Sequence, residues 1–172
     1  MTAPRRWLTR LPLLLLLILC GAFVAQADQW SGRVDWIYDG DTLRVDGLGK
    51  IRLLGIDTPE MAASERDNFY LRLGVSRKTI RRTARDALHF NIRHLKGKQV
   101  TLVPGNPQRD DYGRLLAYVY LPDGRMVNLM LIENGLATVF RRYAFDNKEC
   151  FLEAERKARE DRQGMWKYAK QR

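Results

Sequence analysis

Alternation of side chains with a period of two is the feature that most restricts the fold of this chain, and it occupies residues 30–54. Val34, Trp36 and Tyr38 recur at every second position, and Leu43 and Val45 do so a few residues later. This period is typical of half-buried β-strands. A glycine-containing turn at 47–50 then leads into a third apolar run, so residues 30–54 are predicted to form two successive hairpins.

A helical period replaces the alternation after Pro59. The apolar residues that mark one face of the expected helix are Ile80, Ala84, Ala87, Leu88, Ile92 and Leu95, and Gly97 ends it. Two more strands are expected at 99–104 and 114–121, with a turn at 104–107 between them. A short helix is predicted over 129–134.

A last helix is predicted over about 147–163, opened by a capping box of Asp146 and Glu149. Cys150 is expected to be buried on the apolar stripe of this helix. The tryptophans at 30, 36 and 166 are expected to be packing residues.

Three strands, a helix and two strands is the element order of a five-stranded Greek-key β-barrel of the OB type. We therefore predict an α+β fold, with this barrel and about three flanking α-helices. Residues 28–172 are predicted to be a single domain, with a basic helix at about 76–96.

Residues 1–27 have the pattern of a cleaved signal peptide. Three arginines precede an apolar run from Leu11 to Ala25, and Ala25-Gln26-Ala27 is a small-x-small cleavage site. The alternative is an uncleaved membrane anchor, but the run is shorter than the roughly 17–25 residues that span a bilayer. The sequence predicts an exported protein, periplasmic or secreted, without stable membrane insertion after cleavage.

The net charge of +10 indicates a polyanionic partner, either nucleic acid or an acidic membrane surface. The signal segment holds three basic residues and no acidic ones, which leaves +7 for the mature chain. The residues that recur every four positions along the expected basic helix are Arg77, Arg81, Arg85, His89 and Arg93. This ridge is either a nucleic-acid surface or a solvated helix face.

Acidic residues concentrate in two short segments of this basic chain, Asp39-Gly40-Asp41-Thr42 and Asp57-Thr58-Pro59-Glu60. Carboxylate and carbonyl oxygens at strand ends suit Ca²⁺, whereas the simpler explanation for Asp39 is a local turn. Arg52 precedes the second segment, and Arg114 follows a third acidic turn at 110–113. Cleavage of a phosphodiester needs a cation, guanidinium groups that hold phosphate oxygens, and a carboxylate that orients or deprotonates water.

Three segments together resemble the staphylococcal (thermo)nuclease family: 39–42, Arg52-Leu53-Leu54-Gly55-Ile56-Asp57-Thr58-Pro59-Glu60, and Asp111-Tyr112-Gly113-Arg114-Leu115-Leu116-Ala117-Tyr118-Val119-Tyr120. Val127-Asn128, Gly135-Leu136-Ala137 and Gly164-x-Trp166 follow in the same order. The resemblance covers roughly residues 30–166. It implies an OB-type barrel and a Ca²⁺-dependent nuclease that acts on DNA and RNA and leaves 3′-phosphates, with endonucleolytic cleavage expected.

The resemblance also implies a role for individual residues. Asp41 and Asp57 match the calcium carboxylates, and Thr58 matches the residue that offers its backbone carbonyl. Glu60 matches the residue that positions or deprotonates water. The remaining matches are Arg52 and Arg114 as phosphate-binding arginines, Tyr112 as a substrate-phosphate contact, and Asp39 in the outer shell of the metal.

An ungapped count from Gly135 places Arg141 where the family has a tyrosine on the base. Tyr143 or Phe140 is therefore a candidate for base stacking. Two other functions remain open, namely a non-catalytic nucleic-acid-binding domain of the same fold and a basic envelope protein that binds acidic lipid surfaces. The expected substrates are DNA and RNA, and the expected state is a monomer without an obligate protein partner.

Overall fold

The computed structural model describes residues 29–169, so the predicted signal segment lies outside the described residues. The strands are β1 (Trp30–Ile37), β2 (Thr42–Val45), β3 (Gly49–Leu53), β4 (Ile56–Asp57), β5 (Gln99–Arg109), β6 (Leu115–Tyr120) and β7 (Thr138–Val139). The helices are α1 (Asp67–Arg72), α2 (Arg77–Leu95), α3 (Val127–Glu133) and α4 (Lys148–Glu160), and a 3₁₀ turn, η1 (Gly164–Tyr168), follows them. Within residues 29–169 no helix is both long and apolar enough to cross a bilayer.

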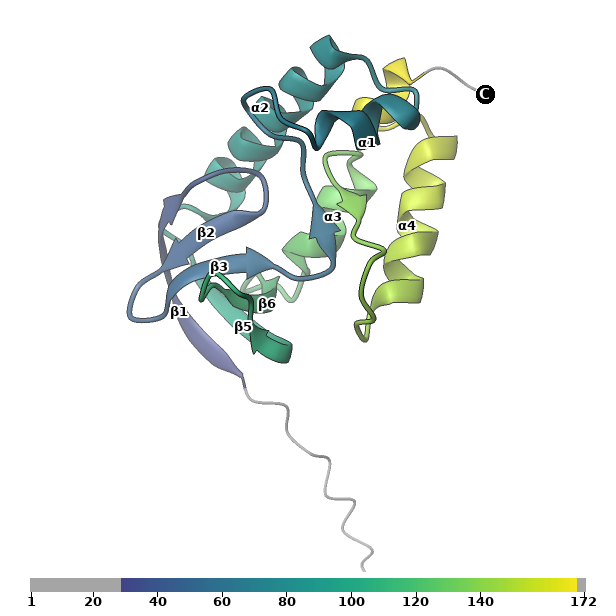
Figure 1. Ribbon diagram of the computed structural model, residues 1–172. Coiled ribbons are helices and arrows are strands. Elements are labelled where there is room, and N and C mark those ends of the chain that lie inside the picture. Colours follow the sequence, from purple (N-terminus) through teal and green to yellow (C-terminus); the bar gives the residue numbers. More distant parts are fainter. Residues whose placement is uncertain (1–28, 170–172) are drawn as a thin grey trace, which may run out of the picture.

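Five strands close into a barrel in the order β1-β2-β3-β6-β5, and β4 and β7 form a separate two-stranded sheet. The two predicted hairpins are present as the antiparallel pairs β1–β2 and β2–β3. β3 and β6 pair in parallel, and β1 closes the barrel against β5. This strand order confirms the predicted OB-type barrel. Figure 1 shows the barrel at the lower left, with α3 and α4 to its right and α1 and α2 above.

A β-bulge in β1 reverses the faces of its last residues. The pairing with β2 shifts between Val34 and Trp36, after which Ile37 pairs with Leu43. Val34 and Ile37 consequently point into the core, while Trp36 is 48% exposed and Tyr38 is 38% exposed. The prediction that Trp36 is a packing residue is wrong, because the extra residue of a bulge breaks the simple alternation.

Helix α2 packs the periodic apolar face predicted for it, with Ile80, Ala84, Ala87 and Leu95 buried. Ser76 caps its N-terminus by accepting a hydrogen bond from the Thr79 backbone N–H at 3.2 Å. Ile92, expected on the same face, is 40% exposed. The helix lies against the barrel and reaches the turn that follows β1, where the site begins.

A second, smaller core joins the C-terminal end of the chain to α1 and α2. Its buried members are Tyr70, Val75, Ile80, Ala158, Met165 and Trp166. The chain after α4 reaches this cluster by passing against the turn that follows α3. Gly135 and Gly164 meet there with positive φ, and a Cβ on Gly135 would lie 2.2 Å from the Gln163 carbonyl oxygen. Only glycine fits a contact this close.

Several local predictions are wrong. β5 continues as a strand through the turn expected at 104–107, with an irregular register between Pro104 and Arg109. Asn147, not a capping box at Asp146, is the N-cap of α4. Cys150 is exposed, because the buried face of α4 consists of Phe151, Glu155 and Ala158.

Candidate active site

The turn after β1 is built by Asp39 and Gly40. The Asp39 Oδ1 atom accepts hydrogen bonds from the backbone N–H groups of Asp41 and Thr42 at 2.9 and 2.7 Å. Asp39 is therefore an Asx-type turn residue, as the simpler explanation required. Burial and the Asp41 carboxylate raise its pKa to about 6.

Gly40 lets this turn press against α2 and the Thr58 loop. A Cβ at position 40 would lie 2.7 Å from both the Ala87 Cβ and the Thr58 Oγ1. Asn91 of α2 also donates from its side-chain amide to the Gly40 carbonyl oxygen at 2.8 Å. Helix α2 thus fixes the position of this turn, and with it the position of Asp41.

Asp41 and Asp57 face each other across the guanidinium group of Arg52. Arg52 Nη1 lies 2.9 Å from Asp41 Oδ2, and its Nη2 lies 3.4 Å from Asp57 Oδ1. Thr58 donates to the same Asp41 oxygen from its backbone N–H at 2.9 Å and from its hydroxyl at 2.8 Å. Both carboxylates are buried, with residue exposures of 7% and 8%. The structure therefore brings Asp41, Asp57, Thr58 and Arg52 together as predicted.

Two residues missed by the sequence interpretation hold the other oxygen of Asp57. Arg66 donates from Nε to Asp57 Oδ2 at 2.8 Å, and the Tyr70 hydroxyl donates to it at 2.9 Å. Burial, followed by the adjacent Asp57 charge, raises the pKa of Tyr70, so Tyr70 remains a proton donor. Both residues belong to segment 62–75, which has no strong period, and so no sequence signal identified them.

Glu60 lies at the end of the acidic loop with an exposed side chain. Burial and then the Asp41 and Asp57 carboxylates raise its pKa. Its carboxylate accepts no hydrogen bond from residues 29–169, so it is available to a water molecule or a metal. Arg81 of α2 donates to the Glu60 carbonyl oxygen and to Asp67, which ties this loop to the helix. One member of the predicted arginine ridge is thus used inside the molecule.

Arg114 is held by an acid of its own. Asp110 Oδ2 accepts from Arg114 Nε at 2.8 Å and from Nη2 at 2.7 Å, while Oδ1 accepts from two backbone N–H groups of the same loop, those of Tyr112 and Arg114. The other Arg114 terminal nitrogen, Nη1, lies 3.5 Å from Thr42 Oγ1, so the side chain faces the acidic turn. Tyr112 is 85% exposed at the tip of the loop. The spacing of Asp110 and Arg114 across a turn was the signal available in the sequence.

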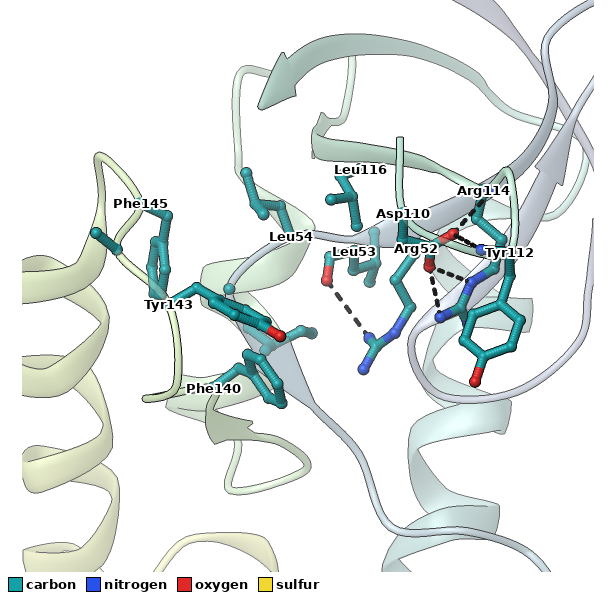
Figure 2. A pocket seen from close by; sticks show the side chains of 13 residues that line it. Arg52, Leu53, Leu54, Asp110, Tyr112, Arg114, Leu116, Phe140, Tyr143 and Phe145 are labelled. Atoms are coloured by element: carbon teal, nitrogen blue, oxygen red, sulfur yellow. Dashed lines mark hydrogen bonds and ion pairs between the residues drawn. The ribbon is translucent and has the colours of Figure 1, made fainter. Parts of the chain in front are cut away.

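A cavity of about 290 Å³ lies beside these arginines. Figure 2 shows Arg52, Arg114 and Tyr112 on one side of it and Phe140, Tyr143 and Phe145 on the other. Leu53, Leu54 and Leu116 are among its apolar lining residues. One wall of the cavity is thus cationic and the other aromatic, which suits a ligand with a phosphate at one end and a flat ring at the other.

Arg141 does not line this cavity. Its guanidinium pairs with Glu155 of α4, whose side chain is 2% exposed and also accepts from the Val139 backbone N–H at 3.1 Å. Of the candidates for base stacking, Tyr143 and Phe140 lie on the cavity wall. Arg141 is instead a link between β7 and α4.

Within residues 29–169, no three acidic, histidine or cysteine side chains converge as a ready-made metal cage. The donor set at Asp41, Asp57 and Thr58 nevertheless fits a hard cation that completes its coordination with water, because Ca²⁺ takes carboxylate, carbonyl and water oxygens. The raised pKa values of Asp39 and Glu60 support this fit. Both reflect burial and negative charge from neighbouring carboxylates that Arg52 does not fully compensate.

Comparison with known proteins identifies the family. The family model described as "Staphylococcal nuclease homologue" matches residues 50–168. The chain belongs to the staphylococcal nuclease family. The thermonuclease of Staphylococcus hyicus is 30% identical to it over 149 residues, which cover 84% of this chain and 80% of that protein.

Two further relatives are similar over most of this chain. The uncharacterized protein MJ1439 of Methanocaldococcus jannaschii is 36% identical over 162 residues, covering 86% of this chain and 77% of that one. Endonuclease YhcR of Bacillus subtilis is 32% identical over 148 residues, which are 80% of this chain but 11% of the relative. Membership of this family and its nuclease-named relatives support a hydrolase that acts on phosphodiester bonds.

Proposed function

We propose that this staphylococcal nuclease homologue is a Ca²⁺-dependent nuclease that hydrolyses DNA and RNA, as an endonuclease that leaves 3′-phosphates. The observation that carries the proposal is the position of two guanidinium groups, those of Arg52 and Arg114, on the rim of a cavity whose opposite wall is aromatic. A nucleotide has the same two-ended chemistry, with an anionic phosphate and a flat base. The acidic pair behind Arg52 adds the oxygen ligands that a hydrolytic cation requires.

The metal ligands in this proposal are the carboxylates of Asp41 and Asp57 and the backbone carbonyl of Thr58. Bound Ca²⁺ supplies positive charge that neutralises a phosphate oxygen as negative charge builds on it. Thr58 orients Asp41 through two hydrogen bonds, and Arg66 and Tyr70 orient Asp57. Asp39 stays outside the ligand set, and its Oδ1 atom holds the turn that places Asp41.

Glu60 takes the role of the base that positions or deprotonates the attacking water. Its side chain is exposed, and its carboxylate accepts no hydrogen bond from residues 29–169, which leaves it open to take a proton from water. Arg52 and Arg114 hold the phosphate oxygens, for which the planar guanidinium fork is suited. Tyr112 contacts a neighbouring phosphate from the loop tip, and Tyr143 and Phe140 stack on the base.

Export is part of the proposal. The segment 1–27 has the pattern of a signal peptide, and its removal leaves a mature protein that is periplasmic or secreted and monomeric. Mass spectrometry of the protein recovered from an expressing cell tests the cleavage after Ala27. A mature chain that retains residues 1–27 would contradict it.

The decisive experiment is digestion of a single-stranded DNA oligonucleotide and a matched RNA by the purified mature protein, in Ca²⁺ and in excess chelator. We expect cleavage in Ca²⁺ that the chelator abolishes and added Ca²⁺ restores. Glu60→Gln should lower kcat by about 10²–10⁴-fold and Arg114→Ala by about 10²–10³-fold, with unfolding midpoints unchanged.

The same experiment separates the alternatives. A folded protein that binds the oligonucleotide without cutting it would support the non-catalytic binding domain. A protein that binds anionic vesicles and neither binds nor cuts the oligonucleotide would support the envelope protein. Full activity in chelator would show that hydrolysis does not require Ca²⁺.

A further inference from the structure

Two aromatic rings stand exposed on the outside of the barrel, away from the cavity. Trp36 is 48% exposed after the bulge in β1, and Tyr38, which directly follows the strand, is 38% exposed. Isolated exposed apolar residues are ordinary, but exposed rings at the end of β1 and two residues further on form a platform.

Each ring has a lysine ammonium over it. Lys96 Nζ, from the C-terminal end of α2, lies 4.9 Å from the Trp36 ring centre, and Lys50 Nζ of β3 lies 4.8 Å from the Tyr38 ring centre. Arg44 of β2 is directly opposite Trp36 in the sheet. We call these five residues (Trp36, Tyr38, Arg44, Lys50 and Lys96) the Trp36 face.

One acid lies within this surface. Asp35 accepts from Arg44 Nε at 2.9 Å, and both side chains of this pair are more than one-third exposed. Lys50 and Lys96 pair with no carboxylate of residues 29–169. The Trp36 face is therefore net positive, with its free charge next to its two rings.

The Trp36 face is continuous with the candidate active site. Lys50 is two residues before Arg52 on β3, and Arg44 is two residues after Thr42 on β2, so each pair shares one face of the sheet. Two residues of a strand span roughly 7 Å. In Figure 1, β1, β2 and β3 lie on the side of the barrel away from α4. An extended polyanion that leaves Arg52 along β3 meets Lys50 and Tyr38 next.

We propose that the Trp36 face is a second contact surface for single-stranded nucleic acid, which holds unpaired nucleotides beyond the phosphate at Arg52 and Arg114. Aromatic platforms interleaved with basic side chains are how sequence-tolerant single-strand binding is achieved, because every base has a flat face and every linkage a charge. Paired bases are already stacked, so the surface favours an unpaired strand. The inference rests on the proposed function for its placement beside the scissile phosphate, although binding to the face does not require catalysis.

The test compares two variants with two matched controls. Trp36→Ala/Tyr38→Ala removes the rings, and Lys50→Gln/Lys96→Gln removes two charges. Tyr168→Ala is the control for the rings. Tyr168 of η1 is 49% exposed, has the charged groups of Arg82 and Lys167 over its ring, and lines neither the cavity nor the Trp36 face. Arg156→Gln/Lys157→Gln is the control for charge, since both side chains are more than half exposed on α4 and neither belongs to the ridge of α2.

Binding of a fluorescent oligothymidylate of about 12 nucleotides is measured by anisotropy in chelator, where the proposed Ca²⁺-dependent enzyme should not cut. Stacking on each ring corresponds to at least about a fivefold change in affinity, so the ring variant should bind at least fivefold more weakly. The lysine variant should bind more weakly and lower the slope of log K against log salt by about 1 to 2. Each control should stay within about twofold of the wild type.

Hydrolysis separates this inference from the proposed function. The ratio of kcat/KM for the 12-mer to that for a dinucleotide should fall at least about fivefold in the ring variant and stay constant in the Tyr168 control. Unchanged binding and an unchanged ratio in an active enzyme would overturn the Trp36 face while leaving the nuclease in place. A wild-type protein that does not cleave but still shows ring-dependent binding would overturn the proposed nuclease and leave the Trp36 face in place. Ring-dependent binding to anionic vesicles without an effect on the oligonucleotide would assign the face to a membrane and overturn the inference.

Discussion

Arg52 and Arg114 both pair with carboxylates, but only the partners of Arg52 are proposed metal ligands. Arg52 contacts the two acids that form the proposed calcium site, Asp41 and Asp57. Arg114 has a separate partner, Asp110, that is not a proposed ligand of the metal. The position of Arg114 thus depends on Asp110, which holds both the guanidinium group and the backbone of its loop.

Replacing Asp110 by Asn should therefore lower kcat/KM by about tenfold to a hundredfold, because a displaced guanidinium no longer meets the phosphate. The measurement is steady-state cleavage of a single-stranded oligonucleotide in Ca²⁺. Asp123→Asn is a matched control, since Asp123 holds Arg125 through the same type of contacts on an exposed turn. Equal losses in the two variants would show that Asp110 has no special role.

The same variant should show a defined pH dependence of stability. Although burial acts in the opposite sense, the hydrogen bonds from Arg114 lower the pKa of Asp110 below its usual value. A lowered pKa stabilises the fold above the unfolded pKa of about 3.9, and this stability is lost as the pH falls through the folded pKa. Chemical unfolding of wild type and Asp110→Asn should differ by about 1 kcal/mol at pH 7 and converge below about pH 4. A difference that grows in acid would contradict this assignment.

At the scale of elements, β7 and α4 are joined by a buried carboxylate. Glu155 accepts from the Val139 backbone N–H and pairs with Arg141, while Arg159 Nη2 lies 3.3 Å from it. The segment that follows β7 carries Phe140 and Tyr143 to the cavity wall. The α4 contact therefore positions the aromatic wall.

We expect Arg141→Gln to reduce stability and Tyr143→Ala to weaken substrate binding. Arg141→Gln leaves Glu155 with Arg159 as its remaining cation and should lower the free energy of unfolding by about 1–3 kcal/mol. Tyr143 is 61% exposed, so Tyr143→Ala should change stability by no more than about 0.5 kcal/mol but raise KM at least about fivefold. Urea unfolding and cleavage kinetics on both variants give the comparison. A large increase in KM for Arg141→Gln without any loss of stability would show that Arg141 contacts the base.

Element order was predictable because local sequence decides the alternation of β2 and the apolar face of α2. The clustering of acids and arginines near Asp57 is equally local. The elements α1, β4 and β7 were not predicted, because β4 and β7 have two residues each and α1, with six, is shorter than two helical turns. The exposure of Trp36 and the pairing of Arg141 with Glu155 depend on a bulge and on a distant helix, which no local pattern encodes.

At the scale of the whole molecule, the small second core links the C-terminal turn to the active site. Met165 and Trp166 pack in the same cluster as Tyr70, and the Tyr70 hydroxyl donates to Asp57. Support for a proposed metal ligand near the start of the chain thus comes from residues near its end.

Met165→Ala should lower the free energy of unfolding by about 2–5 kcal/mol, because Met165 is fully buried and the smaller side chain leaves a cavity. Tyr168→Ala, three residues further on and half exposed, should stay within about 0.5 kcal/mol. Urea unfolding of both variants at neutral pH tests the difference. Similar midpoints for the two variants would mean that η1 does not contribute to the core.

The contact between Gly135 and Gly164 determines when the second core can close during synthesis. A ribosome makes the acidic turn, the arginine loop and the aromatic wall before it makes η1, yet the cluster that supports Tyr70 closes only when residues 164–168 dock beside Gly135. A growing chain therefore holds every group of the proposed catalytic set without the packing that orders them. The supporting packing around Tyr70 is therefore established only after residues 164–168 have been made and have docked.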